Sequence, residues 1–143
     1  MSFNVLIVDD SGSMRAIIKK IVTISGFKMD QCFEAGNGKE AMEVLSGNWI
    51  DIIISDINMP EVNGLEFLDQ LQKNETLKEI PVIMITTEGS AERMQEAFNR
   101  GAKGFIKKPF LPEDIKKILF QVIGVSENGG YNEDTRIDDE CDF

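Results

Sequence analysis

Apolar and polar residues follow two periods along the chain, one typical of strands and the other of helices. Short apolar runs, rich in β-branched residues, occupy residues 3–8, 28–33, 49–55, 81–86 and 104–107. Runs of this length predict buried strands. The segments between and after them space their apolar residues as one helix face does, over about 14–22, 38–46, 64–73, 91–100 and 112–123. This alternation predicts an α/β fold, a doubly wound five-stranded parallel sheet with five helices.

The second strand is expected at an edge of the sheet, because Asp30 and Gln31 interrupt its apolar run. In open parallel sheets, ligands bind beyond the carboxyl ends of the strands, where the order of the strands reverses. The side chains that follow the strands are therefore the first candidates for a functional site.

Polar side chains follow four of the five predicted strands. They are Asp9 and Asp10 after the first strand, Asp56 after the third, Thr86 after the fourth and Lys108 after the fifth. Each of them alone is an ordinary turn residue. Because a parallel sheet gathers them at one edge, however, three carboxylates would repel one another there unless a cation lay among them.

Carboxylate oxygens without His or Cys ligands suit Mg²⁺. A metal ion, an ammonium group and a hydroxyl around a carboxylate are also what that carboxylate needs in order to accept a phosphoryl group. We therefore interpret Asp56 as a nucleophile beside a Mg²⁺ site. The absence of histidine from the chain excludes Ser-His-Asp and Cys-His nucleophiles, the usual zinc sites and any phosphohistidine on this chain.

The charge of the chain divides it into two parts. Of a formal net charge of −10, residues 125–143 carry −6, from seven acidic residues and one arginine. We expect a folded domain over residues 1–124 and an acidic C-terminal tail over residues 125–143. The tail has the composition of a disordered segment, and the alternative is that it covers basic residues of the last two helices.

The charge, the apolar stretches and the cysteines of the chain restrict the classes of partner that it can bind. The acidic balance argues against nucleic acid, since a DNA-binding protein needs Lys and Arg against the phosphates. No apolar stretch reaches the roughly 18 residues of a membrane span, and the first residues lack the features of a signal peptide. Cys32 and Cys141 lie outside any redox or metal spacing. A cytoplasmic location without a membrane partner is expected.

Four motifs together resemble the response regulator receiver family. They are VDDSGSMR at 8–15, SDINMPEVNG at 55–64, MITTE at 84–88 and KKPF at 107–110. The opening motif is similar to that of the single-domain chemotaxis branch, the CheY type. The likeness covers residues 3–123 and implies a flavodoxin-like sheet with the strand order 2-1-3-4-5.

The resemblance also implies a role for each matching residue. Asp56 is the implied phosphorylation site. Asp9 and Asp10 are implied Mg²⁺ ligands with Asp56 itself and the backbone carbonyl of Asn58. Thr86 and Lys108 are implied to bind the phosphoryl oxygens.

Two further roles follow from the same resemblance. Thr86 and Phe105 are the implied switch residues, and Phe105 lacks the phenol of a tyrosine, so a switch there must act by burying or exposing the ring. Asn58 and Glu88 stand where the family tunes the lifetime of the phosphoryl group.

The function implied by the resemblance is a phosphorylation-dependent switch of a two-component system, and the chain would be a phosphoacceptor rather than an enzyme. Its only chemistry would be autophosphorylation and autodephosphorylation. A sensor histidine kinase of the chemotaxis type would be the donor. A flagellar motor switch protein or another output protein would bind the phosphorylated form, with a phosphatase as a further partner.

Three other functions remain open. Within the same class, a stand-alone phosphorelay intermediate would pass its phosphoryl group to a second histidine protein. A flavodoxin-like electron carrier is disfavoured because Asp9 and Asp10 would repel the phosphate of a flavin nucleotide. A Mg²⁺-dependent phosphohydrolase would require a second acid at the position of Asn58.

Overall fold

The strands form a single parallel sheet. The computed structural model describes residues 2–59, 63–86, 91–108 and 110–123, so the predictions for Glu88 and for the tail at 125–143 lie outside the described residues. The strand order is β2-β1-β3-β4-β5, with every neighbouring pair parallel. The strands are β1 (Phe3–Val8), β2 (Met29–Ala35), β3 (Ile52–Asp56), β4 (Val82–Thr86) and β5 (Gly104–Lys107). The predicted fold class, the strand order and the edge position of β2 are confirmed.

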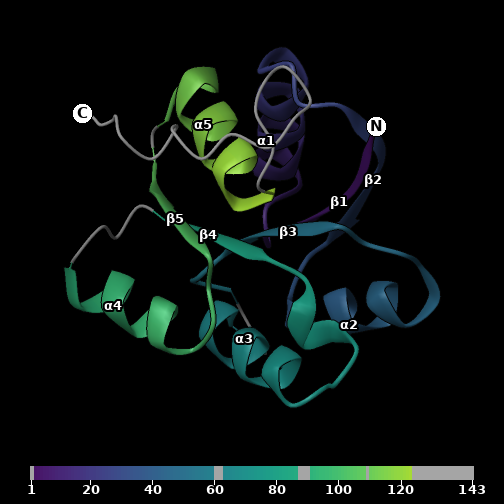
Figure 1. Cartoon of the computed structure of the whole chain (residues 1–143), viewed down its shortest axis with the longest axis vertical. Coiled ribbons are helices and arrows are strands. Elements are labelled where there is room, and N and C mark those ends of the chain that lie inside the picture. The colour runs from purple at the N-terminus through teal and green to yellow at the C-terminus, as the bar shows by residue number, and fades with distance from the viewer. Residues whose placement is uncertain (1, 60–62, 87–90, 109, 124–143) are drawn as a thin grey trace.

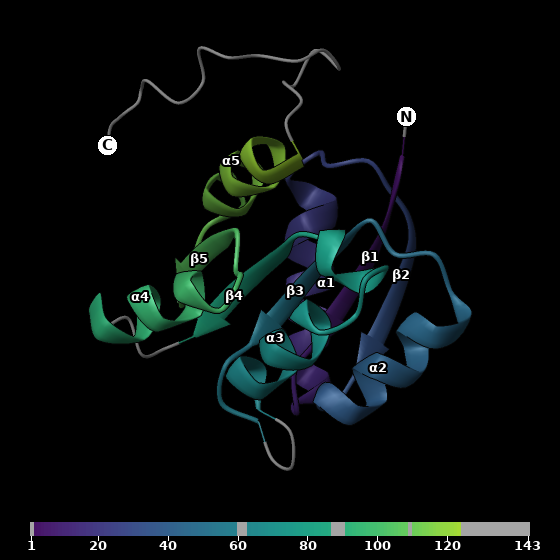
Figure 2. The same ribbon diagram turned by 60° about the horizontal axis from the view of Figure 1, so that its bottom comes forward.

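Helices cover both faces of the sheet. They are α1 (Gly12–Ile24), α2 (Gly38–Gly47), α3 (Gly64–Gln72), α4 (Ala91–Asn99) and α5 (Pro112–Ile123), with a short 3₁₀ helix, η1 (Leu77–Glu79). Helices α1 and α5 lie on one face, and α2, α3 and α4 lie on the other (Figures 1 and 2). Within the described residues, no helix is long and apolar enough to cross a membrane.

The two-residue alternation of the strands builds a separate core on each face. Val5 and Ile7 of β1 pack in the cluster that contains Ile18 of α1 and Leu119 of α5. Leu6 and Val8 point the other way, into the cluster formed with α2, α3 and Ala97 of α4. Because the central strands are covered on both faces, their apolar runs are almost uninterrupted.

Side-chain caps fix where three helices begin. Ser11 accepts a hydrogen bond from the backbone N–H of Met14 at the start of α1, and Asn37 accepts one from Glu40 at the start of α2. Asn63 and Glu66 form a reciprocal capping box at the start of α3. These caps satisfy N–H groups that the first helical turn leaves without a partner.

The connections of the sheet diverge at the carboxyl ends of the neighbouring strands β1 and β3. The chain leaves β1 for α1 on one face of the sheet and leaves the neighbouring strand β3 for α3 on the other face. The carboxyl ends of β1 and β3 therefore lie between diverging connections. This is the position at which doubly wound sheets bind ligands.

Candidate functional site

Asp9 follows directly after β1 and is almost completely buried, at 2% exposure. Its backbone N–H donates to the carbonyl of Ala35 over 3.0 Å, which continues the pairing of β1 with β2. Its Oδ1 accepts from the backbone N–H of Ser11 at 2.9 Å. Its Oδ2 lies 3.3 Å from Nζ of Lys108. A buried carboxylate requires such partners, because burial without them disfavours its charge.

Asp56 is the last residue of β3. Its Oδ1 accepts from the backbone N–H of Ile57 at 2.8 Å, and its Oδ2 lies 4.0 Å from Nζ of Lys108. Burial raises the pKa of Asp56, and the negative charge of Asp9 raises it further, while Lys108 and the N–H groups of Ile57 and Asn58 act to lower it. The shift is upward because one ammonium group does not compensate for both burial and a second carboxylate.

Asp10 completes a cluster of three carboxylates. One oxygen each from Asp9, Asp10 and Asp56 can be chosen so that all three lie within 4.8 Å of one another. Asp9 is buried, Asp56 is half-buried and Asp10 is exposed, so the cluster opens toward water on one side. Oxygen-only ligands with a side open to water fit a hard divalent cation that retains part of its hydration shell. The predicted juxtaposition of these three side chains is therefore present.

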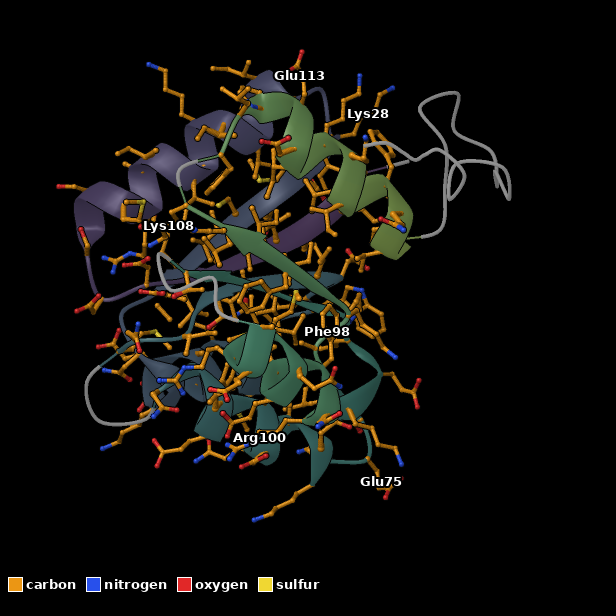
Figure 3. All side chains as sticks on the ribbon, turned by 90° about the vertical axis from the view of Figure 1, so that its left-hand side faces the viewer. Lys28, Glu75, Phe98, Arg100, Lys108 and Glu113 are labelled. Carbon is orange, nitrogen blue, oxygen red and sulfur yellow. The ribbon has the colours of Figure 1, made fainter. Side chains whose placement is uncertain are left out.

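Thr86 and Lys108 come from the two strands beyond β3. Thr86 ends β4 and is fully buried, and the backbone N–H of Lys108 donates to its carbonyl at 2.7 Å. The Lys108 side chain is only 12% exposed, and its ammonium group lies between Asp9 and Asp56. Figure 3 shows Lys108 at the end of β5, well apart from Arg100 below α4.

The other predicted residues lie around this centre. Asn58 is exposed, two residues beyond Asp56. Phe105 is half-buried on β5, where it pairs with Met84 of β4 and packs against the core that α2, α3 and α4 cover. Glu88 was predicted to act here and lies outside the described residues.

Two residues that support the site were not singled out from the sequence. Gly64 begins α3, and its N–H donates to the carbonyl of Ile57 at 2.8 Å. A Cβ at this position would collide with the carbonyl oxygen of Asp56 and would lie 2.6 Å from Cε of Met84. Only glycine allows α3 to start this close to the end of β3. The Asn-Gly pair at 63–64, which combines a helix cap with a residue without a side chain, was the available signal.

The second residue is Arg15 on α1. Its guanidinium group donates to the backbone carbonyl of Asp9 and to the carboxylate of Glu34. Its spacing of six residues from Asp9 was visible in the motif VDDSGSMR, but the sequence does not indicate that the side chain turns back toward the strand end.

Comparison with known proteins identifies the family. A sequence model described as the response regulator receiver domain matches residues 5–120. The chain belongs to the response regulator receiver family. This receiver is 42% identical over 123 residues to the chemotaxis protein CheY1 of Helicobacter pylori, and the matched region covers 85% of this chain and 98% of that protein. It is 39% identical over 129 residues to a CheY homologue of Campylobacter jejuni, with 90% and 98% coverage.

The solved structures agree with the sequence comparison. The receiver resembles the chemotaxis protein CheY4 of Vibrio cholerae with a TM-score of 0.76 and 37% identity, over 85% of this chain and 99% of that chain. The chain is thus a homologue of the CheY response regulators of two-component signalling, as its motifs predicted.

Proposed function

We propose that this receiver is a phosphorylation-dependent switch in chemotaxis signalling, which accepts a phosphoryl group on Asp56 from a histidine kinase. The observation that carries the proposal is the group of three carboxylates with Lys108 placed between two of them. The chemotaxis role is supported by the names of the relatives. We further propose that residues 1–124 form the receiver and residues 125–143 an acidic tail.

The transfer uses groups that the site provides. Oδ2 of Asp56, the oxygen nearer to Lys108, attacks the phosphorus, an O–P bond forms, and the P–N bond to the donor imidazole breaks. The electron pair of that bond stays on the imidazole nitrogen. Asp9, Asp10, Asp56 and the carbonyl of Asn58 would hold Mg²⁺, which would supply positive charge for the phosphoryl oxygens. Lys108 provides a second positive charge at the same edge.

Thr86 and Phe105 link this chemistry to the surface. In the proposed switch, Thr86 moves toward the new phosphoryl oxygens, and Phe105, on the neighbouring strand, changes its burial in the space that Thr86 vacates. Helix α4, which contacts β5, carries two exposed apolar side chains, Met94 at 39% and Phe98 at 40% exposure, and Figure 3 shows Phe98 on α4 beside β5. This apolar face is the proposed contact for a motor switch protein or another output protein.

We further propose that the lifetime of the phosphoryl group depends on Asn58 and Glu88, whose positions in the sequence match those with which the family tunes it. A phosphatase would act at the same place. The phosphorelay alternative uses the same acceptor and differs in the partner, because the phosphoryl group would move on to a second histidine protein.

The test is covalent labelling with a small donor. With Mg²⁺ and acetyl phosphate or phosphoramidate, the wild-type protein should gain one phosphoryl group by intact mass. Hydroxylamine and base should release it, because an acyl phosphate is an activated anhydride. Asp56→Asn should gain none, and labelling of that variant at the wild-type level would refute the assignment of Asp56.

Asp51→Asn is the matched control. It makes the same chemical change where β3 begins instead of where β3 ends, and it should be labelled as the wild type is. A pull-down with phosphorylated protein then separates the two outputs. Capture of a motor protein supports the switch, whereas transfer of the phosphoryl group to a histidine protein supports the relay.

A further inference from the structure

Arg15 joins three elements beside the carboxylate cluster. From α1, its Nε donates to Oε1 of Glu34 on β2 at 2.9 Å, and its Nη1 donates to the backbone carbonyl of Asp9 at 2.5 Å. Its side chain is only 22% exposed. The guanidinium group is therefore held at two points, in a geometry that a single ammonium group does not reproduce.

The carbonyl that Arg15 binds belongs to the peptide group between Asp9 and Asp10. Asp9 is fixed on its other sides, because its N–H donates to Ala35 and its Oδ1 accepts from Ser11. Asp10 differs, since it is exposed and its carboxylate makes no hydrogen bond or ion pair to any residue that the structure describes. The orientation of Asp10 toward the cluster thus depends on how the preceding peptide group is held.

We propose that Arg15 is a positioning residue for the metal site, which orients the Asp9–Asp10 peptide so that Asp10 converges with Asp9 and Asp56. The inference rests on the proposed function, because it assumes that the three carboxylates bind Mg²⁺. Groups that orient metal ligands in this way commonly change metal affinity by 10- to 100-fold when they are removed. Glu34 has a secondary role, since it holds the far side of the guanidinium group.

The charge of Arg15 acts in the opposite direction to its geometry. A cation beside a metal site repels Mg²⁺, so a purely electrostatic view predicts that neutralising Arg15 strengthens Mg²⁺ binding. The positioning role predicts that Arg15→Gln weakens it. The sign of the change therefore distinguishes the two roles, and Arg15→Lys, which keeps the charge and loses the two-point contact, provides a second measurement.

The experiment measures Mg²⁺ affinity by calorimetric titration of the full-length protein. We expect Arg15→Gln to weaken binding about tenfold, Arg15→Lys to weaken it less, and Glu34→Gln to have the smallest effect in the same direction. In labelling with acetyl phosphate, the Mg²⁺ concentration for half-maximal rate should rise in Arg15→Gln, while the rate at saturating Mg²⁺ stays close to that of the wild type.

Arg100→Gln is the matched control. Arg100 also binds two carboxylates, Asp69 at 3.2 Å and Glu96 at 3.0 Å, but it lies well apart from Lys108 and the site (Figure 3). Thermal unfolding without Mg²⁺ should show both variants folded, and Arg100→Gln should keep the wild-type Mg²⁺ affinity. An equal loss of affinity in Arg100→Gln would overturn the inference, because the effect would then not depend on contact with Asp9.

The remaining outcomes separate this inference from the proposed function. Unchanged or stronger Mg²⁺ binding in Arg15→Gln overturns the positioning role, whatever happens at Asp56. Normal labelling of Asp56→Asn refutes the acceptor assignment and leaves a tenfold loss of Mg²⁺ affinity in Arg15→Gln as support for the positioning role. A wild-type protein that binds no Mg²⁺ overturns both the inference and the metal part of the proposal.

Discussion

Asp51 lies just before β3 and Asp56 ends it, and the two carboxylates have different surroundings. Oδ2 of Asp51 accepts from the backbone N–H of Asn4 at 2.8 Å, and its Oδ1 accepts from Nε1 of Trp49 at 3.0 Å. Both donors are neutral groups of the protein itself. The carboxylate thus ties the start of β3 to the start of β1, where the backbone N–H of Asp51 also donates to Asn4.

At the carboxyl end of β3, the negative charge of the carboxylates exceeds the positive charge of the protein groups beside them. Asp56 shares one ammonium group with Asp9, and Asp10 adds a third carboxylate nearby. The pKa of Asp56 is raised as a result of burial and of this neighbouring charge. A carboxylate whose oxygens are already hydrogen-bonded supports the fold, whereas an undercompensated group retains the capacity to bind a cation or a phosphoryl group.

The comparison predicts that an Asp→Asn substitution has opposite effects in the carboxylate cluster and at Asp51. In the absence of metal, Asp10→Asn should raise the melting temperature slightly, because it removes a charge from a repelling group. Asp51→Asn should lower stability by about 1 kcal/mol, because an amide offers one acceptor oxygen where two donors point. Thermal unfolding of both variants in EDTA measures the difference.

Added Mg²⁺ should then reverse the order of stability of Asp10→Asn and Asp51→Asn. At a concentration 100 times the dissociation constant, bound Mg²⁺ stabilises the folded state by about 2.7 kcal/mol. The wild type and Asp51→Asn should gain this stability, and Asp10→Asn should lose most of it. An equal gain in Asp10→Asn would place the metal elsewhere.

Backbone crowding provides a second comparison, between Gly64 at the site and Gly47 at the end of α2. A Cβ on Gly64 would collide with Asp56 and would lie 2.8 Å from Cα of Ile57, whereas a Cβ on Gly47 meets nothing within 4 Å. We expect Gly64→Ala to destabilise the protein by about 1–3 kcal/mol and to slow labelling of Asp56. Gly47→Ala should stabilise it by about 0.5–1 kcal/mol. Urea unfolding measures both, and equal stability of the two variants would contradict the close approach of α3 to β3.

The fold could be predicted from the sequence because the strands are buried on both faces. Runs such as residues 52–55 are therefore almost continuous, and the helices between them show the apolar spacing of a single buried face. The third strand was predicted to start at residue 49 and starts at Ile52. The apolar Trp49 extended the run, although its ring is 76% exposed and hydrogen-bonded to Asp51.

The site was predicted in part for an equally physical reason. Parallel strands align their carboxyl ends, so residues at or just beyond those ends, such as Asp9 and Asp56, can be predicted to meet without any knowledge of side-chain conformation. The contributions of Arg15 and Gly64 could not be predicted in this way. The contribution of Arg15 depends on a long side chain that turns back from α1 to the end of β1. The contribution of Gly64 depends on the distance between the backbones of α3 and β3.

The smallest predicted effect is a pH dependence that comes from Asp56 at the carboxyl end of β3. Because the pKa of Asp56 is raised above its usual 3.8, the folded state holds more protons than the unfolded state between that value and the raised pKa. The contribution of Asp56 to stability therefore falls as the pH rises through this window. Asp56→Asn should gain stability relative to the wild type over the same window, measured by urea unfolding in EDTA, whereas a difference that stays constant with pH would show that Asp56 titrates normally in the folded protein.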